Sequence, residues 1–344
     1  MAQPFDTVKL QFTGDSFVVA DQIGNDPRFP GRLSVSVSDN ELIALDPYID
    51  RLSKKLIWLD RAGNQTGAIS DWWAVSWPSL SPDEKQFVAD RRDPKTNIDD
   101  LFIADLSGEQ RRRFTIGPDN ARYPIWSPDG SHIFWTSNRE DGFRIFQKSA
   151  IGAGNEEQVS NVIGVGSDLS PDGRFLIFEY GYPKTLPDIW VQPLTEKGQP
   201  FPFIEGEGSQ GVARLSPDGQ WMAYVSEDYS ANREVFIERF PDRGSKLQVS
   251  KKGGVGPHWR RDGRELFYYS SDGYLMAVPV FKGKRLELGS AEPLFEFRPG
   301  NLALTTTPYT VTADGQRFLV NAIVNVMPRA PLTILINWTA GVRK

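Results

Sequence analysis

A short polar phrase returns seven times along the chain, and its regular spacing limits the possible folds more than any other feature. The clearest copies read Ser-Pro-Asp-Gly, and weaker copies keep the aspartate in a similar setting. The phrase recurs about every 45 residues, which is the kind of fixed period that marks a repeat architecture. The aspartates of the seven copies are Asp39, Asp83, Asp129, Asp172, Asp218, Asp262 and Asp314.

Each copy is expected to form a tight corner between two antiparallel strands. Pro presets the backbone angle for the first central position of a type I turn, Asp suits the next position, and Gly supplies the positive φ that follows. Short β-branched and aromatic runs such as Ile133–Trp135 and Phe175–Phe178 lie beside the corners. No window of helical length has a sustained 3.6-residue period. The aspartates are therefore interpreted as turn residues and not as metal ligands or catalytic acids.

Units of about 45 residues with four short strands are typical of the blades of a β-propeller. The sequence predicts an all-β chain with one propeller domain over residues 1–344 and seven blades of four antiparallel strands. Six or eight blades stay open as alternatives, because one step between corners is longer than the others. Residues 1–12 resemble Met276–Leu288, so the chain is expected to begin within a blade. The segment Asp15–Asp21 is then predicted to close the ring as the outer strand of the last blade, beside inner strands from Tyr309–Trp338.

Composition excludes several classes of protein. With 344 residues, of which 39% are hydrophobic, the chain can bury a large core and is not expected to be disordered. The net charge is −5 with both signs mixed along the chain, which argues against binding to nucleic acid or to an anionic membrane. The absence of cysteine excludes disulfides, thiolate metal sites and Cys nucleophiles. Neither a membrane span nor a signal peptide is expected in this chain.

The loops opposite the corners are predicted to surround the axial opening and to carry the binding site. Aromatic rings and Arg guanidinium groups around one concave opening suit a peptide, glycan or protein ligand. Since Trp72 and Trp73 are adjacent, at most one of them faces the opening if the segment is extended. By contrast, Trp77, Trp126 and Trp259 precede corners and are predicted to pack between blades. The candidate ligand-binding residues are Trp72, Trp73, Arg122, Tyr123, Asp168, Gln210 and His258.

The sequence carries no recognisable catalytic motif. A Gly-x-Ser-x-Gly elbow and a Walker A motif are absent, and Gly206–Gly211 matches a dinucleotide-binding pattern without the strand–helix–strand context it needs. Of the two histidines, His258 lies near the predicted opening and is a weak catalytic candidate, whereas His132 follows a corner on the other face. Two separated histidines do not make a multi-His zinc site. We therefore expect neither a metal nor a cofactor.

Two resemblances to known families are visible in the repeats. Tyr123–Gly130 and Leu215–Tyr224 resemble the WD40-like repeats of TolB-type propellers. Gly253–Tyr268 and Leu335–Gly341 are similar to the C-terminal propeller region of bacterial receptor-like serine/threonine protein kinases. This second resemblance implies a sensor or protein-interaction module. It also implies an extracytoplasmic location in such a receptor and a cytoplasmic one otherwise.

Three functions stay open on this reasoning. The favoured hypothesis is a non-catalytic propeller that binds a ligand or protein, as the sensor part of a bacterial signalling protein. The second is an enzyme, a lyase or hydrolase that works at the axial opening with His258 and an Arg or Tyr partner, since the propeller fold also hosts enzymes. The third is a structural module for oligomerisation.

Overall fold

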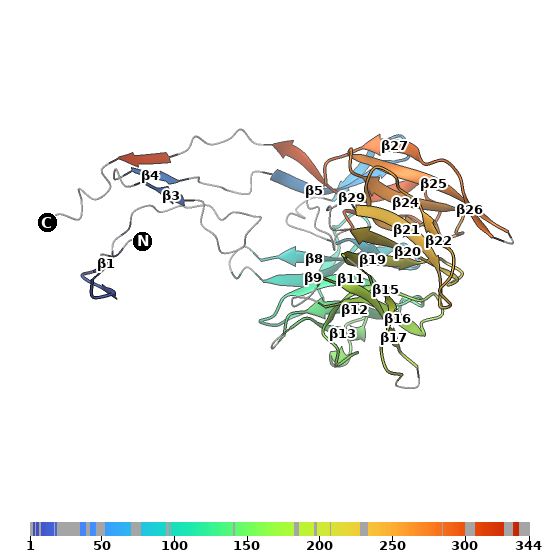
Figure 1. The fold of residues 1–344 in the computed structure, drawn as a ribbon, viewed down its shortest axis with the longest axis horizontal. Coiled ribbons are helices and arrows are strands. Elements are labelled where there is room, and N and C mark those ends of the chain that lie inside the picture. The colour runs from blue at the N-terminus through green and yellow to red at the C-terminus, as the bar shows by residue number, and fades with distance from the viewer. Residues whose placement is uncertain are drawn as a thin grey trace. The chain divides into compact units, whose positions relative to one another are not determined.

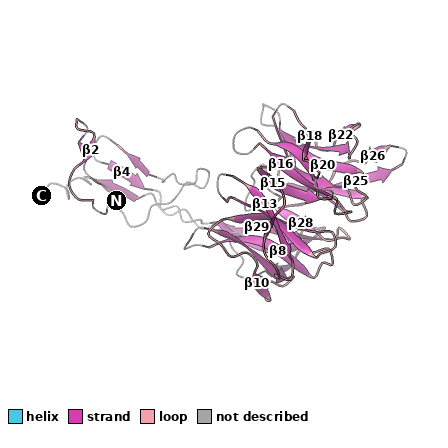
Figure 2. Ribbon diagram, turned by 90° about the horizontal axis from the view of Figure 1, so that it is seen from below, coloured by secondary structure: helices cyan, strands magenta, loops and turns pink. Residues whose placement is uncertain are grey.

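Among the residues that the computed structural model describes, every regular element is a β-strand and none is a helix (Figure 2). The all-β prediction is therefore confirmed. The chain divides into two compact units, one formed by Lys54–Val324 and the other by Met1–Ser53 together with Asn325–Lys344. The described residues are 3, 5–6, 8–16, 18, 35–38, 42–45, 52–69, 77–93, 96, 98–139, 142–181, 186–195, 198–206, 208–227, 233–283, 285–299, 307–326 and 333–336.

The described part of the larger unit holds six antiparallel sheets of four or five strands (Figure 1). Five of the sheets use strands that follow one another along the chain, whereas the sixth combines strands from the two ends of the unit. The first two sheets are β7 (Ser79–Leu80), β8 (Gln86–Arg92), β9 (Asp99–Asp105), β10 (Arg111–Arg113) and β11 (Ala121–Trp126), β12 (His132–Ser137), β13 (Arg144–Ser149), β14 (Glu157–Gln158). The next two are β15 (Gly164–Leu169), β16 (Phe175–Tyr180), β17 (Asp188–Pro193), β18 (Phe201–Ile204) and β19 (Ser209–Leu215), β20 (Trp221–Glu227), β21 (Arg233–Arg239), β22 (Lys246–Gln248). The fifth is β23 (Gly254–Trp259), β24 (Glu265–Ser270), β25 (Tyr274–Lys282), β26 (Leu286–Leu288), β27 (Glu292–Glu296), and the sixth is β28 (Tyr309–Val311), β29 (Arg317–Val326), β5 (Leu52–Asp60), β6 (Gln65–Ile69).

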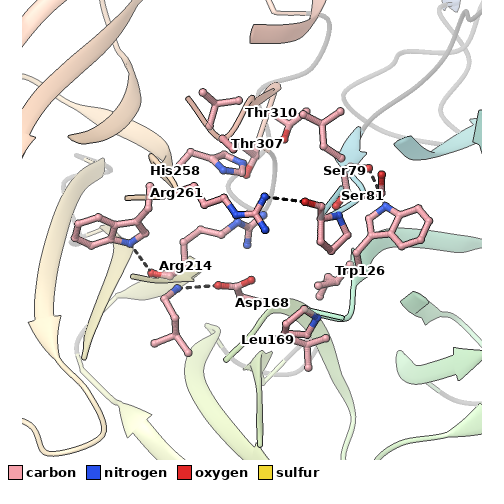
Figure 3. Close-up of a pocket in the computed structure, with 18 of the residues that line it drawn as sticks. Ser79, Ser81, Trp126, Asp168, Leu169, Arg214, His258, Arg261, Thr307 and Thr310 are labelled. Carbon is pink, nitrogen blue, oxygen red and sulfur yellow. Dashed lines mark hydrogen bonds between the residues drawn. The ribbon is translucent and has the colours of Figure 1, made fainter. Parts of the chain in front are cut away.

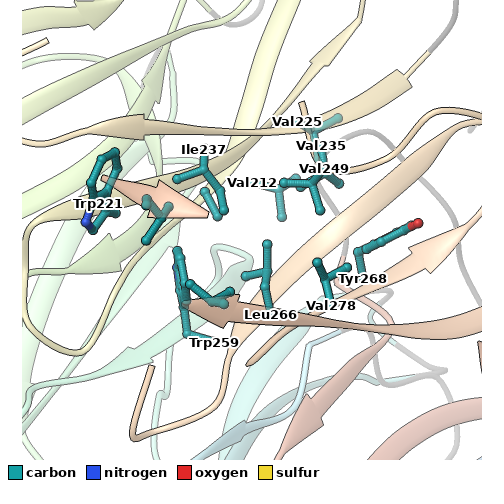
Figure 4. Close-up of a cluster of buried hydrophobic side chains, with 13 residues drawn as sticks. Val212, Trp221, Val225, Val235, Ile237, Val249, Trp259, Leu266, Tyr268 and Val278 are labelled. Atoms are coloured by element: carbon teal, nitrogen blue, oxygen red, sulfur yellow. The ribbon is translucent and has the colours of Figure 1, made fainter. Parts of the chain in front are cut away.

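The first strands of the six sheets contact one another in order. β11 contacts β7 and β15, β19 contacts β15 and β23, and β28 contacts β23 and β7, so the succession returns to its start. Within the described residues, one cluster of buried hydrophobic side chains lies between each pair of neighbouring sheets. In Figure 4, Val212 and Ile237 of one sheet pack with Leu266 and Val278 of the next. Each sheet is thus covered on both faces by its neighbours, as stacked repeats require.

The corners form as the repeat phrase predicts. In the second sheet the amide of Gly130 donates to the carbonyl of Ser127 at 2.9 Å, and the Ser127 hydroxyl donates to Asp129 at 2.6 Å. Gly130 has a φ of 72°. The hydroxyl bond from Ser127 lowers the pKa of Asp129 to about 2, so this carboxylate is committed to its own turn. The matching residues with positive φ in the other corners are Glu84, Gly173, Gly219, Gly263 and Gly315. Asp39 lies outside the described residues.

The sixth sheet closes through other strands than the sequence predicts. The inner pair β28 and β29 continues into β5 and β6, so Leu52–Ile69 supplies the outer strands. Most of Asp15–Asp21, the predicted closing strand, lies outside the described residues. Alternate residues of β5 explain this choice, because Leu56 and Trp58 fill the cluster on one side of the sheet and Ile57 fills the cluster on the other. Since the first and last repeats share this sheet, six sheets make up the described ring. The predicted count of seven blades is not confirmed.

The smaller unit contains two short sheets among its described residues. One is the hairpin of β1 (Phe5–Asp6) and β2 (Gln11–Phe12), which forms a two-stranded sheet of its own among the described residues. The expectation that the chain begins within a blade is therefore not confirmed. The other is β3 (Val35–Val37), β4 (Leu42–Leu45) and β30 (Thr333–Ile336). β30 was expected as the third strand of the last repeat, but it pairs with β4. The single propeller domain expected over residues 1–344 stays a prediction.

Candidate functional site: an axial cavity

A cavity of about 510 Å³ lies along the axis of the six sheets, and each sheet contributes to its wall (Figure 3). The wall includes the residue two positions before each corner, so six equivalent places of the repeat face one space. At three of these places the side chain is ionisable and at one it is aliphatic. The six residues are Ser79, Ile125, Asp168, Arg214, His258 and Thr310.

A β-bulge in the first strand precedes several of these positions. The register of the strand pair shifts just before Ile125, Asp168, Arg214 and His258. Nearby residues of three of these strands have a positive φ, among them Val212 at 50°. A bulge re-aims the side chain that follows it, and here it coincides with the charged residues of the wall.

Side chains of the preceding sheet hold two of these bulges in place. The hydroxyl of Thr136 on β12 accepts a hydrogen bond from the amide of Gly166 at 3.0 Å. At the equivalent place on β16, the carboxylate of Glu179 accepts from the amide of Val212 at 2.7 Å. Because a bulge leaves backbone donors outside the ladder, a buried acceptor from the preceding sheet satisfies them. The geometry of the cavity wall therefore depends on contacts between sheets.

Asp168 and Arg214 form the charged floor of the cavity. Asp168 accepts a hydrogen bond from the amide of Leu215 at 2.7 Å, and Arg214 donates to the carbonyl of Ser167 and, at 2.9 Å, to that of Ala213. Burial raises the pKa of Asp168, and the positive charge of Arg214 opposes that rise. Burial lowers the pKa of Arg214, and the nearby negative charges of Asp168 and Glu179 oppose that fall. The two side chains thus stabilise each other's charge across neighbouring sheets.

His258 is a neutral imidazole in this setting. Burial lowers its pKa to about 3, and the positive charge of Arg214 contributes to the shift. Its ring centroid lies 5.3 Å from that of Tyr309, whose hydroxyl donates to the carbonyl of Gly256 at 2.8 Å. A base with so low a pKa takes up a proton poorly near neutral pH. His258 is better suited to hydrogen bonding with a ligand than to proton transfer.

Glu179 is a buried carboxyl group behind the wall, with an exposed fraction of 2%. Burial raises its pKa to about 7, while the bonds from the Val212 amide and the Ser167 hydroxyl act in the opposite direction. Gly211 makes room for it, since a Cβ there would lie 2.8 Å from a carboxylate oxygen. The sequence reasoning missed Glu179, although a charged residue within the apolar run Phe-Leu-Ile-Phe-Glu-Tyr was a visible signal.

The rim of the cavity is built from the corners themselves. The second corner position is Pro in four sheets, and the fifth sheet has Arg261 instead. Arg261 reaches across the opening and donates to the carbonyl of Pro82 at 2.8 Å (Figure 3). This residue was also missed, although an Arg in place of the corner Pro distinguishes its copy of the phrase. The six rim residues are Pro82, Pro128, Pro171, Pro217, Arg261 and Ala313.

The structure brings only part of the predicted site together. Asp168 and His258 share the axial cavity, whereas Arg122 and Tyr123 line a separate cavity of about 90 Å³. The guanidinium of Arg122 pairs with Asp99, and Gln210 is buried in β19 with 3% exposure. Trp72 and Trp73 lie outside the described residues. The axial cavity is bordered by the corners, whereas the sequence placed the opening at the opposite loops.

The tryptophans predicted to pack between sheets also border the axial cavity. Trp126 and Trp259 belong to the hydrophobic clusters between sheets, which agrees with their expected role. Their indole N–H groups donate to the first strand of the preceding sheet, to Ser79 O and Arg214 O respectively, each at 3.1 Å. Trp77 is also buried, and its ring packs edge-on against Tyr123 at 4.9 Å. These contacts fix neighbouring sheets to each other at the level of the cavity.

The described part of the chain shows no feature of a metal site or of a membrane-spanning helix. There, no three His, Asp or Glu side chains are grouped in a way that could hold a metal ion. The same residues include no helix long and apolar enough to cross a membrane.

Comparison with known proteins supports the fold. The chain is similar to the structure of a putative TolB from Agrobacterium tumefaciens, with a TM-score of 0.61, 18% identity, and coverage of 80% of this chain and 99% of that one. It also resembles a puromycin-hydrolyzing peptidase of Mycobacterium tuberculosis, with a TM-score of 0.54, 17% identity, and coverage of 72% and 42%. A TolB-like propeller fold is thus confirmed, whereas the link to receptor-like kinases stays a prediction.

Curated proteins of similar sequence match parts of this chain at 24% to 28% identity. An uncharacterized protein of Agrobacterium fabrum is 28% identical over 54% of this chain and 67% of its own length. Dipeptidyl-peptidase 5 of Porphyromonas gingivalis is 26% identical over 65% of this chain, and the uncharacterized peptidase YuxL of Bacillus subtilis is 24% identical over 46%. The chain spans only 42% and 24% of these two peptidases, respectively. No protein-family model matches the chain.

Proposed function

We propose that residues Lys54–Val324 form a six-bladed, non-catalytic propeller that binds a peptide or another polar ligand in the axial cavity. One observation carries the proposal: six equivalent positions of the repeat face a single space, and Asp168, Arg214 and His258 converge there from three successive sheets. Repeat positions that serve only packing have no need for three different ionisable side chains. A few convergent polar groups in a concave wall are the usual mark of a ligand site.

The chemistry of the wall favours an acceptor-bearing ligand. Arg261 at the rim and Arg214 at the floor present guanidinium donors, and the neutral imidazole of His258 can donate or accept. Proline rings and Trp126 give the cavity apolar surface beside these donors. A peptide supplies carbonyl oxygens, a terminal carboxylate and apolar side chains together, so it fits this mixture. The role of sensor in a bacterial signalling protein is part of this proposal.

The binding test uses short acetylated peptides and chitin oligosaccharides, measured by titration calorimetry on the full chain. We expect peptides with a free carboxylate to bind and Arg261→Gln to weaken them about tenfold, as the loss of a charge-assisted hydrogen bond would. Arg264→Gln is the matched control, because this neighbouring side chain is 79% exposed and does not line the cavity. Equal affinities of the two variants, or no binding by any peptide, would overturn the proposal.

An enzyme remains the second candidate because two relatives bear peptidase names. It would have to use His258, whose low pKa makes it a weak base at neutral pH. Hydrolysis of dipeptidyl p-nitroanilides separates the two functions. We expect no turnover above buffer, and turnover that disappears in His258→Ala would establish the enzyme instead.

A further inference from the structure

We infer that the axial cavity is one end of a longer site, and that a groove leading outward from it takes an extended acidic peptide. This inference rests on the proposed function and names its ligand class. A second cavity of about 760 Å³ lies beside the first. The two share part of their lining, namely Ser81, Pro82, Trp126 and Arg261. A ligand in the axial cavity therefore has a continuous path along the corner face, and Arg261 lines both parts of it.

The outer end of the groove presents a second guanidinium. Arg112 lies in β10 between two other arginines, and all three side chains are exposed. Successive residues of a strand point to opposite faces, so Arg111 and Arg113 lie on the other side. Arg113 is paired with Asp100 at 2.5 Å, whereas Arg112 lines the groove and donates to the carbonyl of Ala150. The groove is thus bounded by Arg261 at its inner end and Arg112 at its outer end.

The two carboxylates of the groove are hydrogen-bonded within their own corners. Asp129 accepts hydrogen bonds from the hydroxyls of Ser127 and Ser131 and from the Ser131 amide, at 2.6 to 3.0 Å. Asp83 accepts from the Ser81 hydroxyl at 2.7 Å and from the Lys85 amide at 3.2 Å. A guanidinium carries five N–H donors, of which the two arginines use few. The groove thus holds two carboxylates that stay bonded in their turns and two guanidinium groups with N–H donors to spare, and carboxylates of a ligand are the strongest acceptors for those donors.

An apolar group completes the outer end. Ile151 lines the groove beside Arg112, and its side chain is 82% exposed. An apolar ligand side chain placed there would cover surface that water now contacts. Carboxylates opposite the two arginines, with an apolar residue between or beyond them, describe an extended acidic peptide. A compact sugar could fill the axial cavity but would not span both arginines.

Fluorescence anisotropy with labelled octapeptides tests this inference on the full chain. The probes are an alternating Glu-Leu peptide, its Gln-Leu and Lys-Leu counterparts, and a two-residue Glu-Leu peptide. We expect the Glu-Leu octapeptide to bind at least tenfold more tightly than the Gln-Leu form, and Arg112→Gln to remove about fivefold to tenfold of its affinity. Arg111→Gln, on the same strand but facing away, is the matched control and should change affinity less than about twofold.

One further variant distinguishes binding in the groove from binding in the axial cavity. Ile151→Glu leaves the backbone of the groove intact and should weaken the Glu-Leu octapeptide by like-charge repulsion while sparing the two-residue peptide. Equal binding of the Glu-Leu and Gln-Leu octapeptides, or equal effects of Arg112→Gln and Arg111→Gln, overturns the groove. If the two-residue peptide binds, if its affinity depends on Arg261, and if the octapeptide binds no more tightly, the groove is overturned as a binding site while the axial site is supported. If no peptide binds at any length, the proposed function itself fails.

Discussion

The first and last repeats contribute strands to two sheets, and these sheets differ sharply in how they are packed. The sheet β28-β29-β5-β6 belongs to the larger unit and is covered by a neighbour on each face. The sheet β3-β4-β30 belongs to the smaller unit and has only three strands. In the first, Phe318 and Leu319 have 0% exposure, whereas in the second Ile334 and Ile336 are 58% and 70% exposed.

The local sequence does not explain this difference. Both sheets are antiparallel, and each contains a strand with an apolar run, Phe318–Val320 in β29 and Leu42–Leu45 in β4. What differs is the presence of a second hydrophobic surface on each side, which a single repeat cannot supply. The burial of a strand in this chain is therefore decided by its neighbours in the ring, and the following predictions test that contrast.

The largest effect is expected for Phe318→Ala. The ring of Phe318 lies 5.2 Å from that of Phe267 and 5.5 Å from that of Phe295, between two sheets. Truncation leaves a cavity and should lower the free energy of unfolding by about 3–5 kcal/mol. Ile336→Ala, at an exposed position of the smaller sheet, should cost less than about 0.5 kcal/mol. Urea unfolding of both variants decides the matter, and similar losses would remove the contrast.

A disulfide can report whether β30 pairs with β4. Ala44 and Ile334 are direct partners across these strands, at a separation that suits a disulfide in antiparallel pairs. Since the chain has no cysteine, the double variant Ala44→Cys with Ile334→Cys should cross-link on mild oxidation and stabilise the smaller sheet by roughly 2–4 kcal/mol. Ala44→Cys with Leu335→Cys is the control, because Leu335 points to the other face. Preferential cross-linking of the control would show another register.

The buried carboxyl group of Glu179 should make the ring unit sensitive to pH. Its pKa in the folded state is about 7, above the unfolded value of 4.5. The stability it contributes is therefore complete below pH 4.5 and is lost as the pH rises through about 7, by on the order of 2–3 kcal/mol. Glu179→Gln should flatten this dependence. Hydrogen exchange from pH 5 to 8 should show the change at β15–β19 and not at β3, β4 and β30.

How far the sequence predicts this molecule can be followed through individual residues. The corners, and the packing roles of Trp126 and Trp259, follow from local turn chemistry and strand alternation, and the structure confirms them. Asp168 and His258, two of the candidate ligand-binding residues, both line the axial cavity. The reason is that repeats place equivalent residues at equivalent depths.

Arg214, Arg261 and Glu179 were not predicted as site residues, for identifiable physical reasons. A bulge before Arg214 breaks the alternation from which its direction would be inferred. The role of Arg261 depends on its hydrogen bond across the ring to the carbonyl of Pro82, and that of Glu179 on the hydrogen bond it accepts from Val212 of the next sheet. Both partners lie far away in the sequence. β29 pairs with β5, which is far away in the sequence, and not with β30, which follows it in the chain. Local patterns specify strands and corners, but they do not say which distant strand completes a sheet.

The smallest predicted effect concerns the bond that joins two sheets at the cavity. The indole of Trp259 donates to the carbonyl of Arg214 at 3.1 Å. Trp259→Phe keeps most of the apolar ring but leaves that carbonyl without its donor, at a cost of about 1–2 kcal/mol. Trp221→Phe is the matched control, since Trp221 packs in the same cluster and the hydrogen bond given for it runs from its backbone amide to Ser216.

Peptide binding separates a local role of this bond from a general loss of stability. Because Arg214 forms the floor of the cavity, Trp259→Phe should also weaken peptides with a free carboxylate by about twofold to threefold, whereas Trp221→Phe should not. An unchanged affinity in both variants would mean that the floor is fixed by the Glu179 contact to the bulge alone. The bond between sheets would then serve the packing of the ring and not its site.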